Sequence, residues 1–176
     1  ALVLAPTREL ALQILDELQR LARHTYMRAA PIYGGVGMGP QEKAFRKGAD
    51  VLIATPGRLL DHFQHDYAAL TGLEYLVLDE ADRMLDMGFL PDIRRVLRHI
   101  PKPRQTFLFS ATMPAPIEAL TKEILRSPTR ISLQRRAAPA RGVTHSVYHV
   151  PSGLKTGLLV ELLKRGGVDD ALVFTR

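Results

Sequence analysis

The segment 75–82 constrains the fold of this chain more than any other stretch. It reads Y-L-V-L-D-E-A-D. Four consecutive apolar residues are typical of a strand buried on both faces of a parallel sheet. Asp79 and Glu80 follow where that strand would end, and Asp82 comes two residues later. Alone, the run fits a strand that enters an acidic solvent loop, but carboxylates in this place also suit Mg²⁺ bound to nucleotide phosphates.

Apolar strand-like runs alternate with helical patterns along the first 133 residues. The expected strands cover residues 1–5, 29–33, 51–54, 75–78, 106–109 and 129–133. Between them, apolar residues recur at helical spacing, as in the series Leu10, Ile14, Leu18 and Leu21. Strands that alternate with helices predict an α/β fold with a mostly parallel sheet.

A polar or glycine-containing motif follows the end of five of these strands. The motifs are P-T-R (Pro6, Thr7, Arg8), G-G (Gly34, Gly35), T-P-G-R (Thr55, Pro56, Gly57, Arg58), D-E-A-D (79–82) and S-A-T (110–112). The ligand crevice of an open parallel sheet lies outside the carboxyl ends of its strands, so we expect all five motifs at one edge. Thr7 and Thr55 could also be helix caps, a role that is compatible with phosphate binding at a helix N-terminus.

Composition narrows the class of protein. The chain has 24 basic and 18 acidic residues, a net charge of +6, which permits a polyanionic partner such as nucleic acid. Cysteine is absent, which rules out disulfides and thiolate metal sites and fits a reducing cytoplasm. No apolar run reaches membrane-spanning length, so we expect no membrane association through such a segment. Both ends stop in strand-like runs, which predicts a piece of a longer protein.

The composition changes after residue 133. Residues 134–142 are basic, small and interrupted by Pro139 and Gly142, which predicts an interdomain linker. Residues 143–150 and 171–174 resemble strands, and leucines at helical spacing lie between them. Residues 143–176 are therefore expected to begin a second α/β domain.

The five motifs, in this order and spacing, resemble those of the DEAD-box RNA helicases. Within that family the chain is similar to the bacterial RhlE-type branch, and the resemblance covers nearly all 176 residues. The segment V-F-T-R at 173–176 also resembles the first motif of the family's second domain. The resemblance implies a partial first RecA-like domain over residues 1–133, a parallel sheet flanked by helices, and the start of a second RecA-like domain.

The resemblance also implies roles for individual residues. Asp79 would hold the Mg²⁺ of bound ATP, directly or through water, and Glu80 would activate the hydrolytic water. Asp82 would form hydrogen bonds with the Ser110 and Thr112 hydroxyls and so couple the ATP site to the RNA site; the alternative for the two hydroxyls is a local turn. The expected RNA track comprises Pro6, Thr7, Arg8, Gly34, Gly35, Thr55, Pro56, Gly57 and Arg58. None of these reads bases, so binding would be independent of sequence.

The chain departs from the family pattern at its two ends. It contains no G-x-x-x-x-G-K-[ST] phosphate loop. In the family, that loop and an adenine-reading Gln motif precede P-T-R-E-L, and an arginine-rich motif lies well beyond residue 176. We therefore expect the middle of a helicase, inactive by itself.

The predicted function of the parent protein is ATP-dependent RNA unwinding. Candidate protein partners are those of ribosome assembly or RNA decay. The alternative is a non-catalytic RNA-binding fragment. A nucleotide-binding enzyme unrelated to RNA would not explain P-T-R-E-L and T-P-G-R. Arg94, Arg95, Arg98 and His99 form a basic helix face that we interpret as solvated.

Overall fold

The computed structural model describes residues 1–132, 144, 146–166 and 170–175. Contacts divide the chain into two units, Ala1–Thr129 and Arg130–Arg176, and each is described by itself. The predicted linker, residues 134–142, lies outside the described residues.

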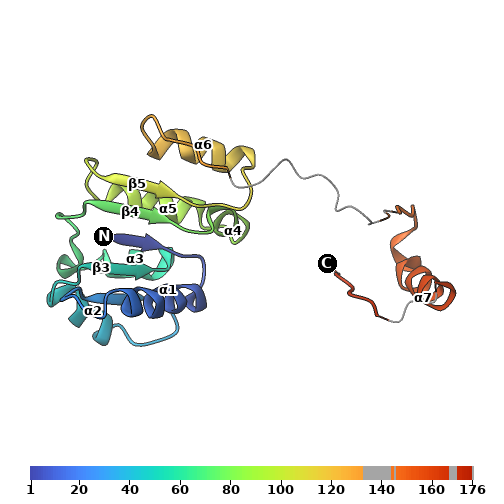
Figure 1. Ribbon diagram of the computed structural model, residues 1–176, viewed down its shortest axis with the longest axis horizontal. Helices are drawn as coiled ribbons and strands as arrows, with labels where there is room; N and C mark the ends of the chain where they lie inside the picture. Colours follow the sequence, from blue (N-terminus) through green and yellow to red (C-terminus); the bar gives the residue numbers. More distant parts are fainter. Residues whose placement is uncertain (133–143, 145, 167–169, 176) are drawn as a thin grey trace. The chain divides into compact units, whose positions relative to one another are not determined.

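The first unit is built around a parallel sheet of five strands (Figure 1). The strands are β1 (Leu2–Leu4), β2 (Ala29–Ile32), β3 (Val51–Ala54), β4 (Tyr75–Leu78) and β5 (Gln105–Leu108). Their order is β2-β3-β1-β4-β5, and every neighbouring pair is parallel. The predicted α/β class is confirmed, and β3 and β4 have the predicted bounds.

Six α-helices and one 3₁₀ turn connect the strands and follow the last of them in this unit. They are α1 (Arg8–Leu21), α2 (Gly39–Arg46), α3 (Pro56–His62), η1 (Asp66–Ala68), α4 (Ala81–Asp86), α5 (Leu90–Arg98) and α6 (Ala115–Ile124). Thr7 caps α1, because its Oγ1 accepts a hydrogen bond from the Leu10 N–H at 3.2 Å. Pro56 and Pro91 lie at the first turns of α3 and α5, where the missing N–H costs no helical bond.

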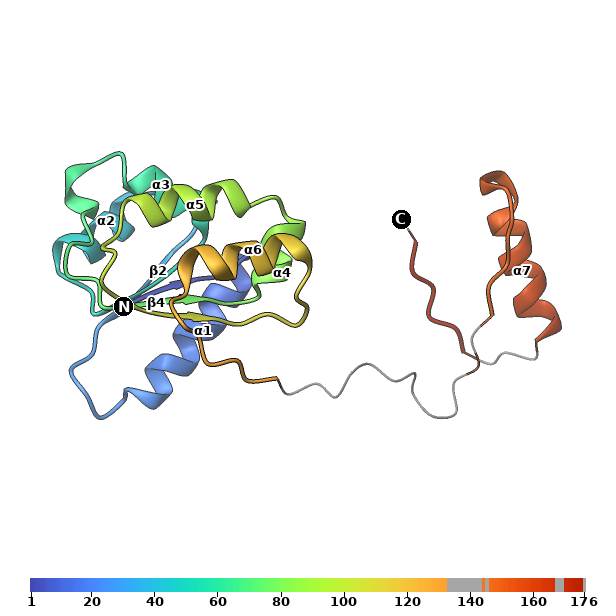
Figure 2. The same ribbon diagram turned by 90° about the horizontal axis from the view of Figure 1, so that it is seen from above.

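An apolar core lies on each of the two faces of the sheet. The larger core contains Leu4 and Leu78 from the sheet together with Leu59 of α3, Val96 of α5 and Leu120 of α6. The smaller core packs α1 against the opposite face, and Figure 2 shows α1 on the other side of the sheet from α3 and α5. Leu21, predicted to lie on the apolar face of α1, is instead 75% exposed because it is the last residue of the helix.

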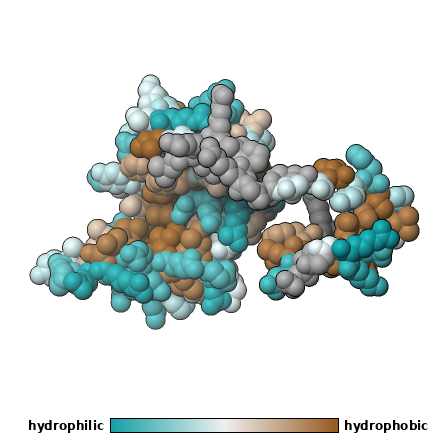
Figure 3. Space-filling view, turned by 45° about the vertical axis from the view of Figure 1, so that its right-hand side comes forward, coloured by the Kyte–Doolittle hydropathy of each residue, from teal (hydrophilic) through white to brown (hydrophobic). Residues whose placement is uncertain are grey.

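The face of the sheet against which α1 packs is only partly covered. Alternation along the strands and the pairing of Val77 with Val3 and Phe107 place Tyr75 and Phe107 on that face. Helix α1 packs against β2 and β3, and Tyr75 and Phe107 remain 49% and 42% exposed. Hydrophobic surface is visible on this unit in Figure 3.

The described part of the second unit contains η2 (Ser152–Leu154) and α7 (Lys155–Arg165). The predicted strand 129–133 is wrong for its described residues, 129–132, and so are the predicted strands 143–150 and 171–174 for theirs. A strand needs a neighbour for its backbone hydrogen bonds, and the second unit offers none among its described residues. Ile131 and Phe174 are accordingly 82% and 87% exposed.

Candidate functional site

The carboxyl ends of all five strands lie in one row. Register pairs Ile32 with Ala54, Ala54 with Leu4, Leu4 with Leu78, and Leu78 with Leu108. Each of these residues is the last of its strand. The five motifs therefore start from the same edge of the sheet, as the sequence predicted.

Backbone hydrogen bonds connect motif residues to the ends of neighbouring strands. The Thr55 N–H donates to the Ile32 carbonyl at 2.9 Å, and the Asp79 N–H donates to the Leu4 carbonyl at 3.0 Å. At the far side, the Ala81 N–H donates to the Phe109 carbonyl at 3.0 Å. The loops thus leave the sheet from fixed positions, which limits how far their side chains can move apart.

Asp79 and Glu80 form a tight turn between β4 and α4. Glu80 precedes the helix with φ 48° and ψ 52°, a left-handed conformation that is uncommon for residues other than glycine. The Glu80 N–H donates to Asp79 Oδ1 at 2.9 Å, and Arg83 Nη1 donates to Glu80 Oε2 at 3.0 Å. The turn therefore places two consecutive acidic residues at the end of β4, beside the central strand β1.

The acidic turn fits a hard cation only in partnership with a ligand. Carboxylate oxygens suit Mg²⁺, which usually takes one or two carboxylates together with phosphate oxygens and water. Within the described residues, no group of three or more Asp, Glu, His or Cys side chains could hold a metal. Asp79, with Glu80 beside it, matches the metal–phosphate arrangement rather than a cage made by protein alone.

Asp82 ties α4 to the loop that follows β5. Its Oδ2 accepts hydrogen bonds from the Thr112 N–H and the Thr112 hydroxyl, each at 2.8 Å. Its backbone N–H donates to Ser110 Oγ at 3.1 Å, and the Ser110 hydroxyl donates to the Thr112 carbonyl at 2.7 Å. The structure thus brings together the three residues expected to interact, with the Ser110 oxygen engaged by the backbone of Asp82.

The environment of Asp82 favours its ionised form. Burial by itself would raise the pKa of this carboxyl group, but hydrogen bonds from the Thr112 hydroxyl and N–H, with smaller contributions from Ser110 and the Arg83 N–H, lower the pKa below its ordinary value. The contact between α4 and the S-A-T loop is therefore a charge-assisted one.

The motifs P-T-R and G-G meet on the other half of the row. The Arg8 guanidinium carbon lies 4.8 Å from the centre of the Tyr33 ring, and Tyr33 immediately precedes Gly34. Gly35 has φ +82°, which favours glycine, and a Cβ built there would lie 4.0 Å from Arg8 Nη1. Gly34 and Gly35 are exposed, and so is Arg8, so a phosphate group can approach all three.

The T-P-G-R motif is more buried than expected for a phosphate-binding segment. Thr55 occupies the N-cap position of α3, but its side chain makes no capping hydrogen bond, so the alternative of a side-chain cap does not hold there. Pro56 is buried, and the Arg58 side chain is only 13% exposed. The Arg58 Nε atom lies 3.7 Å from Asp61 Oδ2 and has no hydrogen-bond partner among the described residues. Gly57 has open space where a Cβ would stand.

Two polar residues behind the G-G loop were not predicted from the sequence. Gln41 is 6% exposed and His62 is fully buried. The signal that could have found His62 is its position three residues after Leu59, on the apolar side of α3.

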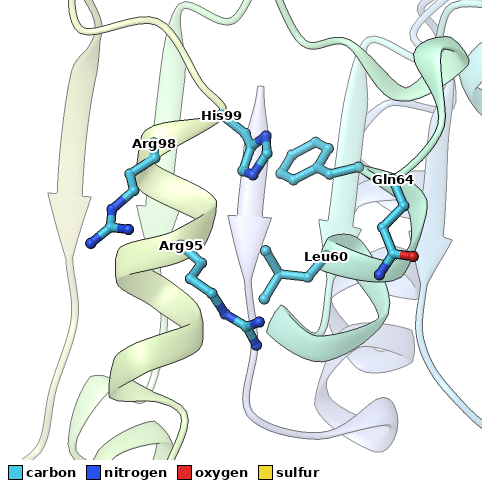
Figure 4. Close-up of a pocket in the computed structure, with 6 residues that line it drawn as sticks. Leu60, Gln64, Arg95, Arg98 and His99 are labelled. Carbon is cyan, nitrogen blue, oxygen red and sulfur yellow. The ribbon is translucent and has the colours of Figure 1, made fainter.

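A shallow pocket lies between α3 and α5 (Figure 4). Its lining residues are Leu60, Phe63, Gln64, Arg95, Arg98 and His99. Arg95 pairs with Asp92 at 2.6 Å, and the His99 ring stacks on Phe63 with centroids 5.0 Å apart. Both helices end at this pocket, and cations near helix C-termini are stabilised by the helix dipole. The predicted solvated face holds for Arg95, Arg98 and His99, which are exposed, whereas Arg94 is partly buried and pairs with Glu123 at 3.0 Å.

The described helices include none with the length and apolar character needed to cross a membrane.

Two comparisons with known proteins found a match. Residues 1–120 match the family model described as DEAD/DEAH box helicase. Among solved structures, the chain is similar to a hypothetical ATP-dependent RNA helicase from Sulfolobus tokodaii, with 37% sequence identity and a TM-score of 0.67. The match covers 72% of this chain and 38% of that protein, so the chain spans well under half of the length of this relative.

Proposed function

The chain belongs to the DEAD/DEAH box helicase family, and from this premise we propose that it supplies the acidic turn and much of the RNA track of an ATP-dependent RNA helicase. The observation that carries the proposal is the row of strand ends, from which all five motifs leave at the same edge of the sheet. The relationship to the RhlE-type branch is part of the proposal.

The proposed ATP chemistry uses the acidic turn. Asp79 would hold Mg²⁺, which when bound neutralises charge on the phosphate oxygens of ATP. Glu80 would accept the proton of the attacking water, and its carboxylate must then leave the pairing with Arg83. The left-handed backbone at Glu80 directs the chain sharply from β4 into α4 and so keeps both carboxylates at the strand end.

The proposed RNA track is the basic and glycine-containing half of the same edge. Arg8 offers a guanidinium group to phosphate oxygens, and the start of α1 beside it offers backbone N–H groups. Gly34 and Gly35 let a sugar–phosphate backbone come close. These groups recognise phosphate rather than bases, so binding is independent of RNA sequence.

The contact of Asp82 with Ser110 and Thr112 would link the two halves. It connects α4, which follows the catalytic turn, to the loop after β5. Closure of two RecA-like domains around ATP and RNA would require this loop in one arrangement. A cytoplasmic location belongs to the same proposal, and the absence of cysteine agrees with it. Partners in ribosome assembly or RNA decay also belong to the proposal.

An ATPase assay tests the proposed function. A polypeptide that carries this chain together with the flanking helicase segments should hydrolyse ATP faster when RNA is added, and Glu80→Gln should abolish turnover while RNA binding in the presence of ATP persists. The 176-residue chain has no G-x-x-x-x-G-K-[ST] loop and should hydrolyse none. RNA-independent turnover, or full turnover by Glu80→Gln, would contradict the proposal.

A further inference from the structure

Gln41 and His62 form a buried polar contact beneath the G-G loop. Gln41 belongs to α2 and His62 is the last residue of α3, the helix that the T-P-G-R motif opens. The His62 ring is fully buried and lies 5.1 Å from the Phe45 ring, centroid to centroid. A buried polar group is costly unless it is hydrogen-bonded, so the contacts of these two side chains are informative.

The hydrogen bonds run in one direction. Gln41 Nε2 donates to the Tyr33 carbonyl at 3.0 Å, because a carbonyl can only accept. The Gln41 Oε1 atom is then the acceptor toward His62 Nε2 at 3.1 Å, so that nitrogen carries a hydrogen. In neutral histidine the other nitrogen, Nδ1, accepts from the Tyr67 hydroxyl at 2.9 Å. One chain of hydrogen bonds, which we call the relay, thus runs from Tyr67 through His62 and Gln41 to the Tyr33 carbonyl.

The charges around His62 are compatible with this neutral tautomer. Burial, followed by the nearby Arg58 cation and by His65, lowers the pKa of His62, against the opposing effects of Asp61 and Glu42. The Tyr67 ring is further covered by Arg46, whose guanidinium carbon lies 5.1 Å from the ring centre.

The relay ends at the residue that begins the G-G loop. Residues 34–37 make no hydrogen bond within the described part of the chain. On their N-terminal side, the nearest hydrogen bond is the one from Gln41 Nε2 to the Tyr33 carbonyl. Tyr33 also carries the Arg8 guanidinium over its ring. The buried contact of Gln41 and His62 therefore reaches Tyr33, which lies next to both Gly34 and Arg8.

We infer that Gln41 and His62 are positioning residues that hold the G-G loop and Arg8 in the arrangement that binds the RNA backbone. The inference rests on the proposed function and goes beyond it, because neither side chain belongs to the RNA track. Through His62, the relay also connects the C-terminal end of α3 to the loop after β2.

Three variants of the 176-residue chain test this inference. His62→Leu removes both ring nitrogens at similar volume, and His62→Gln restores an amide that can donate to Gln41 Oε1. His99→Leu makes the same chemical change at an exposed histidine that lines the pocket between α3 and α5 and takes no part in the relay. The measurements are the affinity for a single-stranded oligouridine at fixed low salt and the amide resonances of Gly34 and Gly35, with circular dichroism as the check on folding.

We expect His62→Leu to bind RNA about tenfold more weakly, which corresponds to about 1.4 kcal/mol, and to shift the Gly34 and Gly35 resonances. His62→Gln should recover most of the affinity and His99→Leu should lose none. If His62→Leu does not fold, Gln41→Met removes the bond to Tyr33 at similar volume and should weaken binding alike.

Three results would overturn the inference. A folded His62→Leu or Gln41→Met chain with wild-type affinity would show that the relay does not position the track. A His62→Gln chain as weak as His62→Leu would assign the effect to the shape of the ring. A wild-type chain that binds no RNA would overturn the proposed function itself and the inference with it.

Discussion

Glu80 adopts a backbone conformation that costs stability for any residue with a Cβ. Its φ of 48° and ψ of 52° lie in the left-handed region, where non-glycine residues are disfavoured by roughly 1–2 kcal/mol. Strained residues of this kind are retained where the surrounding structure requires them, often at functional sites. Here the requirement is the sharp turn from β4 into α4 with two carboxylates at the strand end.

Replacing Glu80 by glycine should therefore stabilise the chain. We expect Glu80→Gly to raise the free energy of unfolding by about 0.5–1 kcal/mol, after allowance for the greater freedom of glycine in the unfolded state. Urea unfolding of Glu80→Gly and Glu80→Gln gives the measurement. Both variants lose the negative charge of the exposed pair with Arg83, and only Glu80→Gln keeps a Cβ, so their difference reports chiefly on the backbone. Equal stability of the two would show that the turn is not strained.

His62 should make stability depend on pH between about 7 and 5. Its pKa is lowered in the folded chain, so below the ordinary value of about 6.5 the unfolded chain binds the proton more readily than the folded chain does. The free energy of unfolding should consequently fall as the pH falls through this range. Urea unfolding at pH 7, 6 and 5 should show a smaller fall for His62→Gln, which has no imidazole. Parallel curves for the two chains would contradict this.

Contacts between elements carry the proposed coupling. Asp82 at the start of α4 and Thr112 after β5 are far apart in sequence, and two hydrogen bonds from Thr112 converge on one carboxylate oxygen. A hydrogen bond to a charged acceptor contributes about 1.5–3 kcal/mol. A contact of that size can shift a two-state closure substantially.

Loss of the Ser110 and Thr112 hydroxyls should separate unwinding from hydrolysis. In a polypeptide that also carries the flanking helicase segments, the double change Ser110→Ala and Thr112→Ala should impair duplex unwinding far more than RNA-stimulated ATPase activity. Both assays should use the same preparation. If the two activities fall in equal proportion, the pair supports the catalytic turn itself and has no separate coupling role.

Short-range patterns made most of the sheet predictable. Apolar runs bounded by turn residues located β3 and β4, and Thr7 was recognisable as a cap because it precedes an amphipathic helix. The common edge followed from the rule for parallel sheets. Helix α4 was missed because its six residues, three of them charged, are too few to show a helical period.

Features that depend on distant residues could not be predicted from the sequence. The Arg8–Tyr33 contact and the relay through Gln41 and His62 join segments 21 to 25 positions apart. The burial of Arg58 likewise depends on packing. Residues 171–174 have the composition of a strand, but a strand forms only where a neighbour provides backbone partners.

The first unit as a whole has one row of strand ends that we propose as the functional site, and one incompletely covered sheet face. Among the described residues, strand β5 has a neighbouring strand on one side only, and Tyr75, Phe107 and Phe109 remain about half exposed. An unpaired edge beside exposed aromatic residues favours association with another chain. The row of carboxyl strand ends, by contrast, presents Arg8 and the exposed glycines Gly34 and Gly35, and we assign RNA binding to this row.

The salt dependence of RNA binding tests that assignment most directly. The affinity of the 176-residue chain for single-stranded RNA should be measured over a series of salt concentrations for wild type, Arg8→Ala and Arg20→Ala. Arg20 is the matched control, an exposed arginine in the last turn of the same helix. We expect Arg8→Ala to bind more weakly with a slope shallower by about 0.7, the value for one phosphate contact with a single strand, while Arg20→Ala parallels wild type. Identical slopes for all three chains would place the RNA contact away from Arg8 and contradict the account.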